Sequence, residues 1–175
     1  ATGTKNSTTF LRGDNTFNAP PNTGITEADQ FRLTADISNP SGDISSNLER
    51  VDDATFAKIG TGMTESSGIY TFPSTGLYLV TLITQTTAIN DAAMVVTMQS
   101  SSNSGTSYDD IANSMSGIAS GSINVTMSIG TFVNVTNAST FRVKFASSSF
   151  ASGTLKGDTS KTETGFTFIR LGDSQ

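Results

Sequence analysis

The chain of 175 residues is 35% hydrophobic and only 14% charged, because Ser, Thr, Asn and Gly are abundant, and this composition favours strands and turns over helices. A net charge of −5 leaves no basic face for a phosphate backbone, and no apolar stretch reaches the roughly 18 residues of a membrane helix, so we expect neither nucleic-acid binding nor membrane insertion. The absence of Cys and His excludes disulfides, thiolate or imidazole metal sites and Cys or His catalysis, and we expect no cofactor and no metal.

Residues 1–24 differ from the rest of the chain, because they lack sustained alternation of polar and apolar side chains and end in Pro20-Pro21. Two prolines favour an extended backbone and stop a helix. We expect an extended connector that attaches to an upstream shaft or to a virion through its isolated apolar residues Phe10, Leu11 and Phe17. A disordered tail is the alternative, because the segment is polar.

From residue 25 onward the side chains alternate with a period of two, which predicts a single all-β domain over residues 25–175. The turn Pro73-Ser74-Thr75-Gly76 predicts a β-hairpin between the strands that flank it. Eight to ten short strands separated by regular turn signals are typical of a sandwich or barrel. The predicted strands are 31–37, 56–59, 69–72, 77–87, 92–99, 107–111, 123–135, 141–145 and 165–171.

Two of these strands, 77–83 and 165–171, carry apolar side chains on both faces. If one set fills the sandwich, the other set would be an exposed apolar patch in a monomer, which soluble proteins usually avoid. A covering helix would bury the patch, but no helical segment is evident. We therefore expect burial against identical copies of the chain. The apolar residues of this second face are Leu79, Ile83, Ile169 and Leu171.

Three separated motifs resemble the C1q/TNF-like domain family: the run 67–80 with its Gly-x-Tyr-x-Phe pattern, the hairpin 131–143, and the strand 165–169 that begins Gly-Phe. The resemblance implies a jelly-roll β-sandwich of about ten antiparallel strands that forms a homotrimer about a three-fold axis. The aromatic residues common near this axis in animal members are replaced by Thr81 and Gly165. The residues that the resemblance places at the trimer interface are Leu79, Thr81, Ile83, Thr167, Ile169 and Leu171.

Residues 9–17, Thr-Phe-Leu-Arg-Gly-Asp-Asn-Thr-Phe, are similar to a segment of bacteriophage tail-fibre and related virion proteins, and 167–173 resemble the C1q-like ends of phage structural proteins. The resemblance implies a non-enzymatic virion protein that is assembled in the host cytoplasm, where the lack of Cys suits a reducing environment. Its expected role is a trimeric fibre tip or knob that binds other virion proteins through the N-terminal segment. The expected host partner is surface polysaccharide or an outer-membrane protein. A capsid decoration or head fibre without a receptor role is an alternative, and a polysaccharide depolymerase is another.

Polar loops at the exposed end of the sandwich are the candidate receptor contacts, because loops on a rigid scaffold commonly carry binding. They are the loops 103–108, 117–122 and 147–159, and their candidate residues are Asn103, Tyr108, Gly117, Ser122, Ser147 and Thr159.

Acidic residues suggest two further sites. The pairs Asp52-Asp53 and Asp109-Asp110 would supply two carboxylates, as in glycosidases, but solvated loop charge is the favoured interpretation. Asp91, Asp109, Asp110 and Asp158 are conceivable calcium ligands, although no fixed spacing supports such a site. The adhesion tripeptide Arg12-Gly13-Asp14 is interpreted as turn chemistry.

Overall fold

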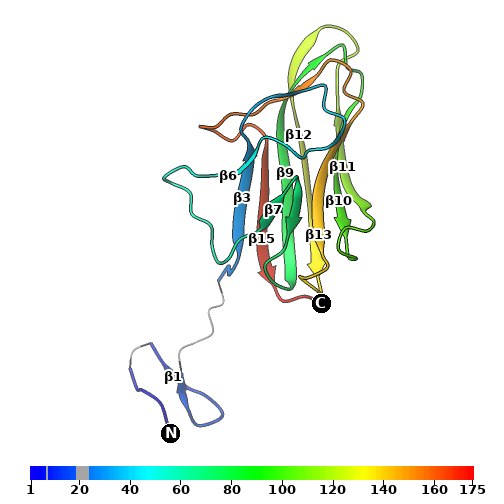
Figure 1. The fold of residues 1–175 in the computed structure, drawn as a ribbon. Helices are drawn as coiled ribbons and strands as arrows, with labels where there is room; N and C mark the ends of the chain where they lie inside the picture. The colour runs from blue at the N-terminus through cyan, green and yellow to red at the C-terminus, as the bar shows by residue number, and fades with distance from the viewer. Residues whose placement is uncertain (7, 19–23) are drawn as a thin grey trace.

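The computed structural model describes residues 1–6, 8–18 and 24–175, and the predicted Pro20-Pro21 stretch lies outside this part of the chain. Two antiparallel sheets pack face to face (Figure 1), and no helix of the described residues is long and apolar enough to cross a membrane. The seven-stranded sheet contains β4 (Ile37–Ser38), β14 (Thr154–Leu155), β9 (Gly76–Ile89), β15 (Gly165–Gly172), β3 (Ala28–Leu33) and β6 (Leu48–Arg50) in that order, with β12 (Ser122–Val135) paired to β9. The six-stranded sheet contains β11 (Asp109–Ser116), β10 (Met94–Ser101), β13 (Arg142–Ser148), β8 (Ile69–Thr71) and β7 (Thr64–Ser66), with β5 (Gly42–Asp43) paired to β13.

The chain passes back and forth between the two sheets, from β8 to β9, from β11 to β12 and from β12 to β13, which is the winding of an antiparallel jelly roll. The longest strands, β9 and β12, pair along their whole length. Within the described residues, ten strands longer than two residues form the two sheets. The predicted all-β jelly-roll sandwich of about ten strands is therefore confirmed.

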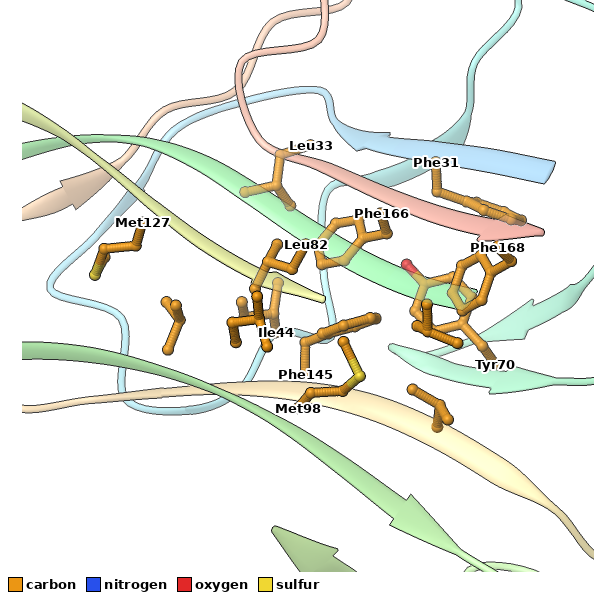
Figure 2. Packing of buried hydrophobic residues seen from close by; sticks show 14 of the residues in the cluster. Phe31, Leu33, Ile44, Tyr70, Leu82, Met98, Met127, Phe145, Phe166 and Phe168 are labelled. Carbon is orange, nitrogen blue, oxygen red and sulfur yellow. The ribbon is translucent and has the colours of Figure 1, made fainter. Parts of the chain in front are cut away.

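The core lies between the sheets and is rich in aromatic rings. Figure 2 shows Phe166 and Phe168 of β15 facing Tyr70 of β8 and Phe145 of β13. The ring centroids of Tyr70 and Phe168 are 4.9 Å apart, and those of Phe145 and Phe166 are 4.7 Å apart. Each such buried side chain stabilises the fold by roughly 1.5–3 kcal/mol through burial alone. The core is formed by alternate residues of each strand. The residues between them point away from the core, on the other face of each sheet.

Two predicted elements are wrong. Residues 56–59 belong to the loop between β6 and β7, where Ile59 makes only an isolated bridge to Ala28. The strands 69–72 and 77–87 exist as β8 and β9, but they lie in different sheets, so the turn 73–76 crosses the sandwich instead of closing a hairpin. Alternation identifies a strand but not the sheet to which it belongs. The hairpin in this region joins β7 to β8 through Ser67 and Gly68, whose φ angles of 51° and 80° are those of a tight two-residue turn.

The N-terminal segment is not simply extended, because its described part folds into a hairpin of β1 (Phe10–Leu11) and β2 (Phe17–Asn18) that lies outside the two sheets (Figure 1). The Asp14 carboxylate accepts hydrogen bonds from the backbone N–H and the hydroxyl of Thr16 at 3.1 and 2.6 Å, and these bonds lower the pKa of Asp14. Arg12-Gly13-Asp14 therefore forms the turn, as predicted. Phe10 and Leu11 are 44% and 53% exposed.

Candidate functional site

The outward face of the seven-stranded sheet, meaning the face turned away from the core, carries most of the predicted trimer residues. In β9, Leu79, Thr81 and Ile83 alternate with buried core residues, so they point outward. The register places Ile169 of β15 opposite Leu79 and Thr167 opposite Thr81. Residues directly opposite each other in an antiparallel pair share a face. Five of the six predicted residues are thus brought together on neighbouring strands.

The sixth predicted residue, Leu171, is at an irregularity. The pairing of β15 with β9 shifts between Arg170 and Gly172, so Leu171 has no partner residue in β9, although its side chain is half exposed. A bulge of this kind re-aims side chains. Simple alternation therefore does not determine where Leu171 points.

An exposed aromatic residue on the outward face was missed in the sequence. Phe132 of β12 lies directly opposite Leu79 and is 63% exposed. The predicted absence of aromatic residues concerned the positions of Thr81 and Gly165, whereas Phe132 lies on the neighbouring strand β12 of the same face. The signal was present, because Phe132 is out of phase with the buried Ile129 and Val133 of the same strand.

Arg32 marks the β3 side of the outward face and is fully buried, at 0% exposure. Its Nε donates to Glu49 Oε1 at 2.7 Å, and its terminal nitrogens donate to Asp52 Oδ1 at 2.7 Å and Asp53 Oδ2 at 2.8 Å. It also donates to the backbone carbonyl of Thr159. Burial opposes the charged guanidinium, but the hydrogen bonds and charges of Glu49 and Asp53 outweigh it, so the pKa of Arg32 is raised.

Asp52 and Asp53 lie in the loop after β6 with side chains 76% and 41% exposed, as expected of loop charge, and both carboxylates also bind the buried Arg32. The second acidic pair lies at the start of β11 in the other sheet, where Asp110 accepts a hydrogen bond from Gln99 Nε2 at 2.6 Å. The structure does not bring the two pairs together.

The predicted receptor loops do not share one end of the sandwich. The distal end is the one where β9 ends at Ile89 and β12 begins at Ser122, opposite the C-terminus (Figure 1). The loop 117–121 and the loop 149–153 lie at this end. The loop 102–108 lies at the proximal end, where Ser104 N–H donates to the carbonyl of Thr140 in the β12–β13 turn at 2.8 Å.

Asp91 organises the distal loops and is only 2% exposed. Its carboxylate accepts backbone hydrogen bonds from Ala151 at 2.6 Å and Ser152 at 3.1 Å, and its backbone carbonyl accepts one from Ile118 at 2.6 Å. The neighbouring Asn90 side chain accepts a bond from Gly121 N–H at 2.8 Å. The turn between β9 and β10 thus holds both distal loops in place. Gly117 is the first residue of the loop 117–121, and Ser122 begins β12 directly after it.

Other predicted loop residues have structural partners. Ser147 is not in a loop: it is buried within β13, and its hydroxyl donates to the Gly42 carbonyl at 3.3 Å. The Asn103 side chain bonds Ser107, and Lys144 Nζ lies 4.3 Å from the centroid of the Tyr108 ring.

The four carboxylates considered as calcium ligands are held separately. Asp91 caps the loop 149–153, Asp109 and Asp110 begin β11, and Asp158 caps Ser160 at 2.7 Å. Among the described residues, no group of three or more acidic side chains is placed to hold a metal ion.

No protein-family model and no curated protein matches the sequence. Among solved structures, the fold is similar to the Eiger TNF from S. frugiperda, with a TM-score of 0.68 and 11% identity over 87% of this chain and 96% of that chain. It is also similar to murine APRIL at pH 5.0, with a TM-score of 0.59 and 10% identity over 83% of this chain and 98% of that chain. These likenesses establish a TNF-like jelly roll, which is the fold that the C1q/TNF resemblance implied.

Proposed function

We propose that the chain is a homotrimeric structural protein of a virion, the tip or knob of a bacteriophage fibre, and that it attaches the particle to the host surface. The observation that carries the proposal is the outward face, where Phe132, Leu79 and Ile169 form a row across three neighbouring strands. Exposed apolar patches of this kind mark protein contacts. Identical copies of the chain are the natural partner, because closed symmetric rings are the usual form of soluble oligomers.

A second surface of the chain supports the trimer. No charged residue lies between Asp110 and Arg142, a stretch that contains most of β11 and all of β12. Ile111 and Met115 of β11 are exposed on this charge-free edge. Interface cores are depleted of charge and enriched in aromatic residues and Met. In a ring of three, the charge-free edge of one copy would pack on the outward face of the next.

Host attachment is assigned to the distal loops 117–121 and 149–153. Both are fixed by the turn at Asn90 and Asp91, so they offer a pre-organised surface at the end away from the N-terminal hairpin. Three copies of a weak site bind with avidity when they reach the host together. The hairpin, with Phe10 and Leu11 exposed, is the proposed attachment to other virion proteins.

A binding role is favoured over catalysis. Both carboxylates of the acidic pair Asp52-Asp53 form ion pairs with the same buried Arg32, which gives them a structural role, and the second acidic pair, Asp109-Asp110, lies in the other sheet. Clearing of host polysaccharide by the purified protein in a halo assay would contradict this assignment.

Electron microscopy of intact particles labelled with an antibody against this chain tests the proposed location. Label at the fibre ends is expected. Label at the capsid vertices would instead support the alternative, a head fibre or capsid decoration.

A further inference from the structure

We propose that residues 156–164, here called the ledge, are a fixed wall on the outward face against which a second copy of the chain is seated. The inference rests on the trimer proposed above. It assigns to the ledge and to Arg32 the task of positioning the neighbouring copy.

The ledge stands on the outward side of β15. Gly165 pairs with the outward residues Ile83 and Arg32, so its own missing side chain would point outward. A Cβ on Gly165 would lie 2.4 Å from Thr162 Cγ2, which means that the ledge occupies this space. The half-exposed Ile83 therefore lies directly beside a wall.

The ledge is held at both ends and near its middle. The backbone of Gln85 in β9 accepts a hydrogen bond from Lys156 N–H and donates one to the Glu163 carbonyl, both at 2.9 Å. Between these two points, the buried Arg32 guanidinium donates to the Thr159 carbonyl. The ledge is thus tied to the same strand that carries Leu79 and Ile83.

Arg32 connects the ledge to a second loop. The same guanidinium binds Glu49 of β6 and both Asp52 and Asp53 of the β6–β7 loop. The planar fork of five N–H donors allows one arginine to hold these acceptors at once, which a lysine cannot do. The single side chain therefore fixes the β3 border of the outward face.

The charge-free edge of β11 and β12 is the surface that fits against this wall. A three-fold ring joins two different patches of the chain at each interface. The outward face is bordered by the ledge beyond β15 and is open at β12, where Phe132 is exposed. Beyond β12, the neighbouring strand β11 exposes Ile111 and Met115 and carries no charge after Asp110, and it is the second patch.

Analytical ultracentrifugation of the full chain over a dilution series tests the ledge. Arg32→Met is expected to keep the β-sheet circular dichroism spectrum but to raise the concentration at which the trimer dissociates at least tenfold. The double variant Asp52→Asn, Asp53→Asn loosens the same contact without altering the buried position, and it is expected to act in the same direction. If Arg32→Met does not fold, this double variant tests whether the ledge positions the second copy.

Asp43→Asn is the matched control, because Asp43 also forms a carboxylate ion pair, with Lys144 at 2.9 Å, but does so in the six-stranded sheet. It is expected to leave dissociation unchanged. If the variants at Arg32 or at Asp52 and Asp53 fold and their trimers dissociate at the wild-type concentration, the role of the ledge is overturned but the trimer is not. A wild-type protein that sediments as a monomer would overturn the trimer itself.

Discussion

Two buried tyrosines differ in one hydrogen bond. The Tyr78 hydroxyl donates to the Ser74 carbonyl at 3.1 Å and lies 2.9 Å from its hydroxyl, whereas the Tyr70 hydroxyl has no partner within the described parts of the chain. Burial raises the pKa of Tyr70 well above its ordinary value. A buried polar group without a partner costs about 1–3 kcal/mol.

We therefore predict opposite effects for the two Tyr→Phe changes. Tyr70→Phe is expected to leave the free energy of unfolding unchanged or to raise it by about 1 kcal/mol, and Tyr78→Phe to lower it by about 1 kcal/mol. Urea denaturation at one fixed protein concentration measures both. Equal losses in the two variants would contradict the assignment.

Asp36 gives the fold a dependence on acid. Its carboxylate binds Lys156 and accepts a hydrogen bond from Gly157 N–H at 3.0 Å, and these bonds lower the pKa of Asp36 from its ordinary 3.8. A lowered pKa contributes stability that is present above pH 3.8 and is lost as the pH falls through the folded-state value.

Asp36→Asn is accordingly expected to reduce the free energy of unfolding at neutral pH and to differ progressively less from wild type as the pH falls below 3.8. Urea denaturation at several pH values gives this difference directly. A gap between the two proteins that stays constant through the acid range would show that Asp36 contributes no pH-dependent stability.

Single residues also show what the sequence could reveal. Leu79, Ile83 and Ile169 were placed on the outward face because a strand alternates with a fixed period of two. Arg32 was missed, because its counter-charges arrive on β6 and on a loop whose path depends on the tertiary fold. Alternation along a strand predicts the direction in which a side chain points, but it does not predict which other segments cover that side chain.

At the scale of elements, the long strands were predictable and the connections were less so. The predicted strand 77–87 matches β9, because many alternating residues define it. The turn 73–76 was expected to close a hairpin, yet β8 and β9 lie in opposite sheets. Turn chemistry fixes the local bend, while sheet membership depends on long-range pairing such as β8 with β13.

The distal loops provide the element-scale prediction. Asp91→Ala removes the acceptor for Ala151 and Ser152 N–H, and we expect faster hydrogen exchange in residues 149–153 and a loss of about 1–3 kcal/mol in stability. From the proposed fibre role, phage carrying this change are expected to adsorb to the host less well while the proposed trimer persists.

Asp109→Ala serves as the control for Asp91→Ala, because Asp109 lies at the exposed start of β11 near the proximal end. It is expected to leave exchange in the distal loops unchanged. Unaltered adsorption of the Asp91 variant, despite loosened loops, would argue against receptor binding at the distal end.

On the scale of the whole molecule, charge is unevenly distributed. Residues 111–141 carry none, although the chain as a whole has a net charge of −5. Contacts between exposed charges weaken with added salt, whereas apolar contacts do not. We therefore predict that the proposed trimer dissociates at nearly the same concentration at low and at high sodium chloride. A steep loss of trimer with salt, seen by sedimentation, would indicate an interface built on ion pairs.

The molar mass of the purified chain at micromolar dilution, measured by light scattering, tests the central claim most directly. Three chains of 18.2 kDa give about 55 kDa. Ile83→Glu on the outward face is expected to reduce this mass to that of one folded chain, and Thr71→Glu, on β8 of the six-stranded sheet away from β11, to leave it unchanged. A wild-type protein that remains a soluble 18.2 kDa monomer would contradict the account.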